Sequence, residues 1–435
     1  MIALALVKGF RGLRFNTEKS GDISTVVCPP YDIISEEQRL QYIKQNEYNI
    51  IRLELPKGDN PYESAKTVLD KWLENGILQR EDKDAVYIYE EEFTAYGRPY
   101  KVKGCIVRVK IEEFEKGVIL PHEFTLSKAK EDRFNLMKAT NCNFSQIYAL
   151  YSDEENKTIS KLDELSVGKP DIELTDGDGV IHRMWIVTDE SAVSAVCSDF
   201  TDRKLFIADG HHRYETALNY RNYCRENGLA KEGDAVDYQM MMLVNMEHPG
   251  LVVFPTHRIV RDLEHFDKRE VLKACEKYFN ITEYDSLDNI ESVLTELYNN
   301  NEKAFGMYCG EGKWTLLVLK TLDTMAELLP NVSKASQGLD VSVLHTLILE
   351  KLMGIDAENM AKQINLTYVK QIDDAVKSVD GGTADCAFIL NPTKISEICD
   401  VSSAGEKMPQ KSTYFYPKLI TGLVMNKLDY SKPNK

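Results

Sequence analysis

The chain is short of basic residues. Its 435 residues include 53 Lys and Arg against 69 Asp and Glu, and the formal net charge is -16. Proteins that bind DNA or RNA usually neutralise phosphates with Lys and Arg side chains. No run rich in these residues offsets the deficit, so the composition argues against nucleic acid as a partner.

Long apolar runs and paired cysteine motifs are also missing. The apolar stretch Ile2 to Val7 has no basic segment before it and is far shorter than the ~20 residues of a membrane span. The nine cysteines are scattered and never form C-x-x-C, a pattern typical of reduced thiols. We therefore expect a cytoplasmic protein with no membrane partner.

The chain has the composition of a globular protein with two or three domains. Hydrophobic residues make up 43% and charged residues 28%, and a domain usually takes ~100–200 residues. Strand-like and helix-like stretches both occur along the chain, which predicts a mixed α+β fold. We divide it into an N-terminal α/β region (1–112), a core with the Asp-Gly-His-His-Arg motif (113–262) and a C-terminal α+β region (263–435).

The clearest elements are bounded by Pro, Gly or capping residues. Helices are expected over residues 36–45, 61–75, 268–279, 287–299 and 341–353. Strands are expected over residues 86–93, 100–111, 181–187, 204–208, 251–254, 304–309, 314–319 and 386–390. The Met240-Met241-Met242 run is assigned to a buried strand or helix rather than to a cofactor site.

The strongest functional signal is the junction Asp209-Gly210-His211-His212-Arg213. An apolar strand ends at Asp209, and a helix begins within three residues. Gly210 lets a ligand approach the backbone, and the free N–H groups of the helix start form an anion site. Arg213 and the two imidazoles add donors suited to phosphate oxygens. The alternative is that Asp209 caps the helix and the histidines are surface residues.

The same histidines could instead hold a metal ion. Candidate ligands are His122, Glu123, Asp209, His211, His212 and His257. Consecutive histidines at a helix start point about 100° apart, however, and the chain has no H-x-x-x-H spacing. Zinc is therefore the less favoured prediction, and a metal-dependent hydrolase stays an alternative function.

Three more segments place polar groups beside prolines. In residues 120–125, Pro121 fixes a turn that presents Glu123 as a general base, or the segment is only an acidic loop. In residues 255–258, a strand end presents a hydroxyl, an imidazole and a guanidinium, or only a solvated turn. Residues 408–418 suit a loop that clamps a small polar ligand, or one whose aromatic rings pin the chain to the core.

Together these segments resemble a bacterial family of uncharacterised proteins with an Ala-Asp-Gly-His-His-Arg-Tyr signature, here residues 208–214. The rigid turn at residues 28–32 and the segment 255–258 belong to the same resemblance, which covers nearly the whole chain. More distantly, the chain resembles the free-serine kinases of the ParB/sulfiredoxin-like superfamily. Their Pro-His-Glu element, Asp-Gly-His-His-Arg strand end and late Pro-Lys-x-Thr segment have counterparts here, in the same order, at 121–123, 209–213 and 409–413.

The second resemblance implies a ParB/sulfiredoxin-like catalytic core that makes O-phosphoserine from free L-serine, with ATP or ADP as phosphate donor and Mg²⁺. It implies that Glu123 is the catalytic base and that Asp209 is catalytic and a Mg²⁺ ligand. Phosphate binding would fall to Gly210, His211, His212 and Arg213. Substrate binding would fall to Lys411, Ser412 and Thr413, with Thr256, His257 and Arg258 on the pocket wall. Further candidates are Tyr31, Asp32, His122, Thr125 and Arg133.

The chain departs from the kinase pattern in three places. The spacing between Glu123 and Asp209 is longer, a mostly helical insertion is expected over 263–375, and Tyr414-Phe415-Tyr416 follow the last motif. The expected partners are a nucleotide and an amino acid. A nucleotide-binding regulator of the same superfamily remains an alternative, although the net charge argues against DNA contact. The oligomeric state is left open.

Overall fold

The computed structural model describes residues 5–287 and 289–428. The chain folds as two compact units. Unit 1 comprises Met1–Pro121, Thr125–Val252 and Pro417–Lys435, and unit 2 comprises His122–Phe124 and Val253–Tyr416. The mixed α+β class is confirmed, whereas the division into three regions stays a prediction. Residues 2–4 of the N-terminal apolar stretch lie outside the described residues.

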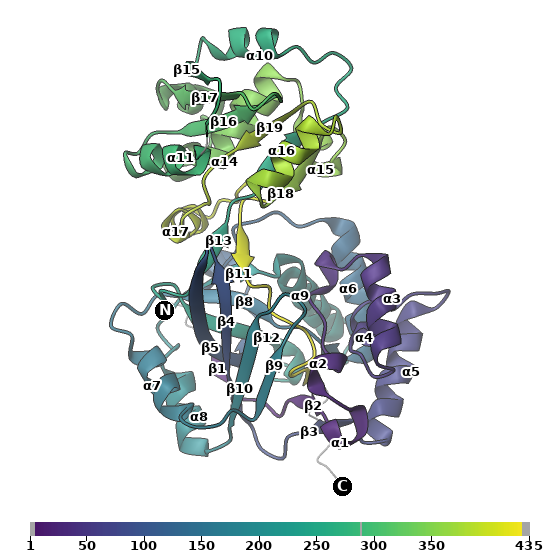
Figure 1. The fold of residues 1–435 in the computed structure, drawn as a ribbon. Helices are drawn as coiled ribbons and strands as arrows, with labels where there is room; N and C mark the ends of the chain where they lie inside the picture. Colours follow the sequence, from purple (N-terminus) through teal and green to yellow (C-terminus); the bar gives the residue numbers. More distant parts are fainter. Residues whose placement is uncertain (1–4, 288, 429–435) are drawn as a thin grey trace. The chain divides into compact units, whose positions relative to one another are not determined.

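Unit 1 is built on a nine-stranded mixed sheet (Figure 1). The strand order is β6-β11-β8-β12-β5-β4-β10-β9, and β1 pairs with β5. The β11/β6 and β12/β8 pairs are parallel. The strands are β1 (Val7–Lys8), β4 (Val86–Ala95), β5 (Arg98–Lys110), β6 (Ile119–Leu120), β8 (Ile147–Tyr151), β9 (Ile172–Thr175), β10 (Ile181–Val187), β11 (Leu205–Asp209) and β12 (Tyr238–Asn245).

Helices and short ribbons complete unit 1. The helices are α1 (Thr17–Ser20), α2 (Ile23–Val26), α3 (Glu36–Gln45), α4 (Ile51–Glu54), α5 (Pro61–Glu74), α6 (Ser127–Thr140), α7 (Lys157–Leu165), α8 (Glu190–Ser198) and α9 (His211–Glu226). Short 3₁₀ turns are η1 (Tyr31–Ile33), η2 (Phe114–Lys116) and η3 (Ala235–Asp237). Two small ribbons pair β2 (Leu13–Phe15) with β3 (Leu78–Arg80), and β7 (Cys142–Asn143) with β21 (Asn426–Lys427).

Local sequence explains several of these elements. Ser35 and Gln38 form a reciprocal capping box that starts α3. Tyr96 and Gly97 both have positive φ, 49° and 68°, the geometry that closes a two-residue hairpin between β4 and β5. The predicted β12 run of methionines is a fully buried strand. The strands predicted over 86–93 and 100–111 are confirmed as β4 and β5, and the helices predicted over 36–45 and 61–75 as α3 and α5, the latter ending at Glu74.

One apolar core covers a face of the unit 1 sheet. Alternate residues of β4, β5, β8, β11 and β12 point into it, because successive strand residues face opposite sides. Leu162 of α7, Val196 of α8 and Ala217 of α9 pack against them. Helix α9 is thereby fixed directly after β11, so that its first turn follows the carboxyl end of a buried strand.

Unit 2 contains a six-stranded sheet in the order β15-β17-β16-β19-β14-β18. Its strands are β14 (His257–Val260), β15 (Phe279–Tyr284), β16 (Ala304–Tyr308), β17 (Trp314–Leu319), β18 (Leu366–Val369) and β19 (Cys386–Ile389), and β13 (Val252–Phe254) pairs with β20 (Tyr414–Tyr416). The helices are α10 (Lys268–Cys275), α11 (Ile290–Asn299), α12 (Asp323–Leu328), α13 (Lys334–Gln337), α14 (Asp340–Ser342), α15 (Ala357–Lys362), α16 (Ile372–Asp380) and α17 (Ile395–Ser403).

The segment 263–375 is less helical than expected, because β15 and β18 join the two predicted strands, β16 and β17, within it. The helix expected over 268–279 ends at Cys275, since Phe279 is buried as the first residue of β15. The helix expected over 341–353 is mostly a π-helix, η4 (Val343–Leu352). No helix among the described residues is both long and apolar enough to cross a bilayer.

A buried polar cluster lies in unit 1, centred on Glu91 of β4. Glu91 is fully buried, accepts a 3.3 Å hydrogen bond from the Tyr89 hydroxyl, and has no hydrogen-bond partner at Oε2 among the described residues. His182 Nδ1 lies 2.6 Å from the Tyr89 hydroxyl, and His182 Nε2 lies 3.1 Å from Asp176 Oδ2. Burial raises the pKa of Glu91 to about 7, against the opposing effects of His182 and Tyr89.

Replacing Glu91 with Gln is expected to stabilise the protein at alkaline pH. The raised pKa means that the folded state holds the Glu91 proton up to about pH 7, whereas the unfolded state releases it near 4.5. The free energy of unfolding therefore falls as pH rises through this window, by about 3 kcal/mol in total, and Gln removes that loss. Urea unfolding at pH 5 and pH 8 measures the difference.

The matched control is Glu90→Gln on the same strand. Glu90 is also buried, at 4% exposure, but Arg183 and Lys103 lie 3.0 and 3.3 Å from its oxygens. Removing its charge is expected to destabilise the fold at both pH values. Equal unfolding free energies of the Glu91→Gln and native proteins at pH 8 would contradict the prediction.

Candidate functional site

The junction between β11 and α9 depends on Gly210. Its φ of 97° lies in the left-handed region, which lets the chain turn from the strand into the helix without strain. A Cβ atom at this position would lie 3.0 Å from Nε and Nη2 of Arg213. The guanidinium therefore lies directly over the Gly210 backbone, at the start of a 16-residue helix.

Asp209 lies between two cations. Arg213 Nη2 donates to Asp209 Oδ2 at 2.7 Å, and Lys418 Nζ donates to Oδ1. Burial alone would raise the pKa of Asp209, but Lys418 and Arg213, with a smaller effect of His211, hold it well below its usual range. One carboxylate thus faces two cations beside a helix N-terminus, and the local charge favours an anion.

The two histidines of the motif differ in environment. His211 is only 4% exposed and lies close enough to Asp209 to lower its pKa. His212 Nε2 accepts a 2.9 Å hydrogen bond from the Leu126 N–H, so this nitrogen carries no proton in this arrangement. His212 therefore holds the start of α6 against α9.

Thr125 and Lys130 hold the same two helices together. The Thr125 hydroxyl donates to Glu215 Oε2 at 2.6 Å, and Lys130 Nζ donates to the same oxygen at 2.7 Å. Glu215 lies one turn into α9. Thr125, a sequence candidate, thus positions the helix that carries Arg213.

Tyr31 and Arg133 stack beneath the junction. The Arg133 guanidinium lies 4.1 Å from the centre of the Tyr31 ring, and its Nη1 donates to the Glu54 carbonyl at 2.7 Å. Burial raises the pKa of Tyr31 to about 12, so the phenol stays protonated at neutral pH. Asp32, its neighbour, is exposed on the 3₁₀ turn.

Arg133 also lines a small cavity that reaches Arg213. The cavity has a volume of about 30 Å³ and is lined by Glu54, Arg133, Ser145, Arg213, Thr216 and Gln239, among others. The structure therefore brings together Tyr31, Arg133 and the Asp209–Arg213 motif within unit 1.

In unit 2, the Pro-His-Glu segment meets the late loop. Glu123 Oε1 accepts a 3.0 Å hydrogen bond from the Lys411 N–H, 288 residues away in the chain. The His122 carbonyl accepts from the Met408 N–H at 2.7 Å, and His122 Nε2 lies 3.0 Å from the Thr413 hydroxyl. Two of the three segments behind the kinase resemblance are thus in direct contact.

Arg258 is a buried cation beside the same loop. It is 1% exposed, and its Nη2 donates to the Lys411 carbonyl at 3.1 Å. Its Nε donates to His345 Nε2 at 3.1 Å, and its Nη1 donates to the Thr256 carbonyl. None of the carboxylates in the described ranges forms an ion pair with Arg258. Burial lowers its pKa to about 10, which leaves the charge intact at neutral pH.

Other predicted residues of unit 2 have structural roles. His257 opens β14 next to Arg258, and its side chain points to the opposite face of the sheet. His257 is buried and therefore does not lie in a solvated turn, which the sequence left as an alternative. Burial lowers the pKa of His257 to about 3, so its side chain is neutral. The Ser412 hydroxyl donates to the Pro409 carbonyl, which shapes the loop. Lys411 has a φ of 58° and an exposed side chain, so its contacts with Glu123 and Arg258 are made by its backbone.

The residues missed by the sequence analysis are Lys418, His345 and Tyr368. Lys418 lies at the end of the segment 408–418, but nothing in that segment links it to Asp209, 209 residues earlier. Tyr368 is paired with Arg258 across β18 and β14, and the guanidinium lies 5.4 Å from its ring centre. His345 comes from the π-helix, for which the sequence offered no signal.

The predicted Mg²⁺ ligand does not fit a metal in this arrangement. Both oxygens of Asp209 already accept hydrogen bonds from cations. Across residues 5–287 and 289–428, no group of three His, Cys, Asp or Glu side chains is placed to hold a metal ion. Arg213 and Lys418 instead leave the surroundings of Asp209 with a net positive charge, which favours an anion.

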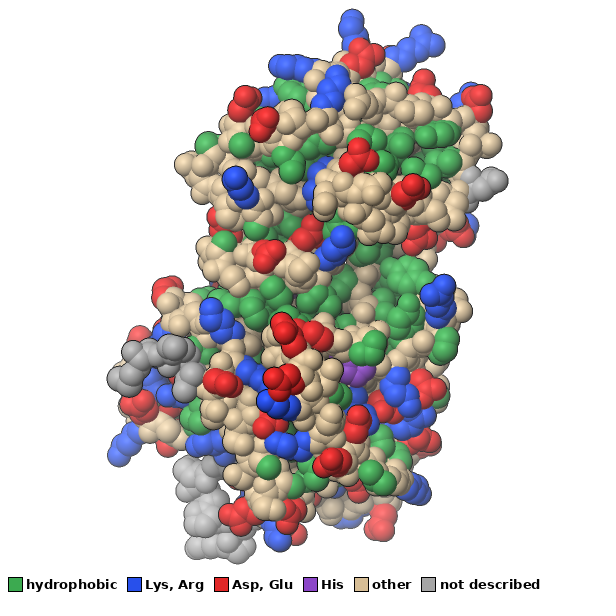
Figure 2. Space-filling view, turned by 90° about the vertical axis from the view of Figure 1, so that its left-hand side faces the viewer, with side chains coloured by type: hydrophobic (Ala, Val, Ile, Leu, Met, Phe, Trp, Pro, Cys, Tyr) green, Lys and Arg blue, Asp and Glu red, His purple; other side chains and the backbone are tan. Residues whose placement is uncertain are grey.

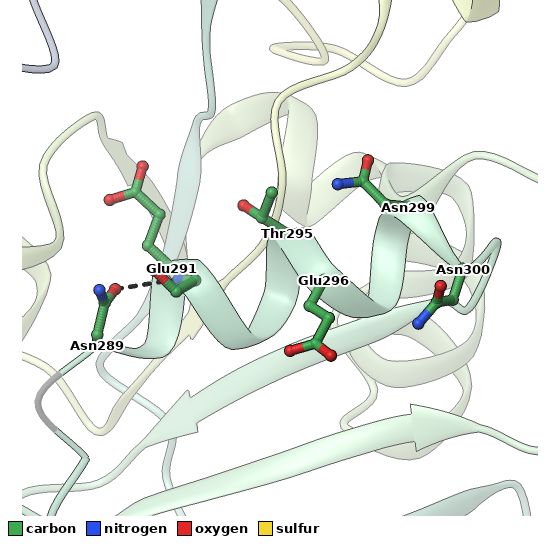
Figure 3. Close-up of a pocket in the computed structure, with 7 residues that line it drawn as sticks. Asn289, Glu291, Thr295, Glu296, Asn299 and Asn300 are labelled. Carbon is green, nitrogen blue, oxygen red and sulfur yellow. Dashed lines mark hydrogen bonds between the residues drawn. The ribbon is translucent and has the colours of Figure 1, made fainter.

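Other hollows lie apart from these residues. The one in Figure 3 runs along α11 and is lined by polar residues such as Asn289, Glu291, Thr295 and Asn299. A groove in unit 1, of about 890 Å³, is lined by residues including Lys8, Arg108, Asp189 and Cys197. None of the sequence candidates lines either hollow. On the face of the molecule that Figure 2 shows, acidic and basic side chains are interspersed.

Comparisons with known proteins identify a family and a set of solved structures. A family model described as "Protein of unknown function (DUF1015)" matches residues 7–342. No curated protein matches the sequence. Solved structures that match include a free serine kinase in complex with AMP, with 13% identity, a TM-score of 0.37, and coverage of 74% of this chain and 91% of the kinase.

Two further matches are equally remote. A conserved hypothetical protein from Pyrococcus furiosus has 14% identity, a TM-score of 0.36, and coverage of 74% of this chain and 95% of its own. SbnI with a C-terminal truncation, from Staphylococcus aureus, has 10% identity, a TM-score of 0.34, and coverage of 73% of this chain and 85% of its own. The functional argument below rests on the residues of this chain.

Proposed function

The chain belongs to the DUF1015 family, and we propose that it is a nucleotide-dependent phosphotransferase acting on a small hydroxy acid, with free L-serine as the substrate. The observation that carries the proposal is the pair of cations on Asp209 at the start of α9. We take L-serine as the substrate because the sequence resembles the free-serine kinases.

The phosphate groups of ATP or ADP would bind at the β11–α9 junction. Lys418 and Arg213 provide the charge, and the first N–H groups of α9 provide donors that have no partner within the helix. Asp209 does not face the phosphates as a ligand. It orients both cations, since each oxygen holds one of them.

Charge neutralisation is the main task of a protein that catalyses phosphoryl transfer. The nucleotide, when bound, supplies the phosphoryl group. We assign stabilisation of the negative charge to Lys418 and Arg213, with Arg133 behind Arg213, and we derive no step through the Mg²⁺ that the resemblance implies.

Unit 2 carries the residues proposed for the acceptor. Burying a charge without an opposite charge beside it costs several kcal/mol, and Arg258 has no carboxylate partner among the described residues, so it favours an anionic ligand. A substrate carboxylate would supply that charge. Thr413, beside His122, would contact the rest of a small amino acid.

Glu123 is the proposed general base. Its Oε1 is held by the Lys411 N–H, and it is half-buried, which leaves a fixed carboxylate able to accept a proton from a hydroxyl. Asp32 is the next candidate, but it is exposed, and its side chain is not held in the same way.

Replacing Lys418 with Gln is expected to weaken ATP and ADP binding ~10- to 100-fold, because hydrogen bonds to charged groups contribute ~1.5–3 kcal/mol. Calorimetry with the full-length protein measures the affinity. Incubation of the native protein with Mg²⁺, ATP or ADP, and L-serine, followed by mass spectrometry, tests for O-phosphoserine.

Lys161→Gln is the matched control, because Lys161 pairs with Asp199 at 2.8 Å in the same unit. Its nucleotide affinity is expected to equal that of the native protein. A folded Lys418→Gln protein with native affinity would remove the junction from the proposed site. Absence of phosphoserine with both nucleotides would argue against the kinase.

Replacing Glu123 with Gln is expected to lower turnover ~10²- to 10⁴-fold, the usual cost of losing a general base. Gln keeps an oxygen that can accept from the Lys411 N–H, so the loop and the nucleotide affinity should be unchanged. Phosphoserine formation and calorimetry give the two readouts. Glu397→Gln, a half-buried carboxylate of the same unit, serves as control, and near-native turnover of Glu123→Gln would refute the assignment.

Replacing Arg258 with Lys is expected to raise the KM for L-serine ~10-fold or more, because an ammonium group cannot reproduce the two-pronged contact of a guanidinium with a carboxylate. The turnover of serinol, which lacks the carboxylate, should be the same in both proteins. Arg221→Lys is the control, since Arg221 is 6% exposed but pairs with Glu113. Equal KM values for L-serine in the native and Arg258→Lys proteins would contradict the carboxylate assignment.

A further inference from the structure

Two cysteines of unit 2 lie at one end of a pair of neighbouring strands: Cys309 directly follows β16, and Cys386 opens β19. Strands β16 and β19 pair in antiparallel register, with Gly306 opposite Ile389 and Tyr308 opposite Ala387. One step further along this register places Cys309 opposite Cys386. Opposite residues in such a pair have Cα atoms ~4.5–5.5 Å apart, which lies inside the ~4.4–6.8 Å range of disulfides.

The two thiols lie side by side in the strand register and differ in access to solvent. Each affects the pKa of the other, and both are free thiols in this structure. Cys386 is fully buried, whereas Cys309 is half-buried at the end of β16, just before the Gly310-Glu311-Gly312 turn. A small reagent can therefore reach Cys309 first and Cys386 only through it.

The environment also makes the accessible thiol the more reactive one. The hydrogen bond from Cys386 lowers the pKa of Cys309, and the charge of Lys268 acts in the same direction against burial. Burial raises the pKa of Cys386 well above its ordinary value. Cys197, another half-buried thiol, lacks this arrangement, and burial raises its pKa to about 11. The thiolate is the nucleophile in thiol–disulfide exchange.

We propose that Cys309 and Cys386 form an oxidisable dithiol site whose reaction partner is a low-molecular-weight disulfide of the glutathione type. The Cys309 thiolate attacks one sulfur of the partner's S–S bond, which breaks and releases one thiolate. Cys386 then loses its proton and attacks the Cys309 sulfur of the mixed disulfide, and the second thiolate leaves. Both cysteines are oxidised, and the partner is reduced to two thiols.

The bond formed would join β16 to β19 at the edge of the ladder next to β14. Cys386 is also the register partner of Val260 in β14, two residues from Arg258. Oxidation would therefore fix the strand pair beside the strand that carries Arg258. The dithiol site depends on the strand register and the thiol contact, so it stands whether or not the chain is a kinase.

The experiment treats the full-length reduced protein with glutathione disulfide and blocks remaining thiols with iodoacetamide at timed intervals. Peptide mass spectrometry then identifies the linked or modified cysteines. We expect a Cys309–Cys386 linked peptide to form at least ~10-fold faster than glutathione adds to Cys197, and dithiothreitol to reverse the link.

Two variants separate the steps. Cys386→Ser should accumulate a glutathione adduct on Cys309, because the second attack is lost. Cys309→Ser should show neither the link nor an adduct on Cys386. Circular dichroism checks that both variants are folded.

Three results would overturn the proposal: a native protein in which Cys309 reacts no faster than Cys197, a stable adduct on Cys309 with no link to Cys386, or a link from Cys309 to a different cysteine. Each of these is read from the native protein, so none depends on whether a variant folds.

Discussion

The contact of Asp209 with Arg213 and Lys418 is the constraint on which the candidate site of unit 1 depends. It ties the end of β11, the first turn of α9 and the C-terminal segment to one carboxylate. Without this carboxylate, two cations next to a helix N-terminus would repel each other and the helix dipole. Asp209 therefore offsets the repulsion that Arg213 and Lys418 would otherwise experience at the start of α9.

In unit 2, the backbone of Lys411 holds two charged side chains together, as Asp209 does in unit 1. Its N–H donates to Glu123, and its carbonyl accepts from Arg258. The positive φ of this residue, 58°, costs backbone energy that the two charged contacts offset. A carboxylate and a guanidinium from distant parts of the chain are thus held by the two backbone groups of one residue.

The sequence allowed good prediction where the determinants are local. The β4–β5 hairpin follows from Tyr96-Gly97, α3 from the Ser35–Gln38 box, and the β11–α9 junction from Gly210. The secondary structure of 263–375 was predicted less well. Buried and exposed residues alternate irregularly in β15, so its first residue was assigned to the end of the preceding helix. The pairing of Glu123 with Lys411 and of Asp209 with Lys418 spans more than 200 residues, and no local pattern encodes such contacts.

A comparison among the buried arginines shows why Arg258 is singled out. Arg133 contacts Asp132 and Glu54, Arg221 contacts Glu113, and Arg39 contacts Glu36. Arg258 is more buried than Arg133 or Arg221, yet its hydrogen bonds go to two carbonyls and to His345. His345 cannot share the charge, because burial, and then the charge of Arg258, hold its pKa well below the ordinary value and keep it neutral. If stability were the only requirement, an apolar side chain of similar size would serve as well or better at such a position. The cost of keeping a full positive charge here is explained when an anion from outside the chain completes the pair.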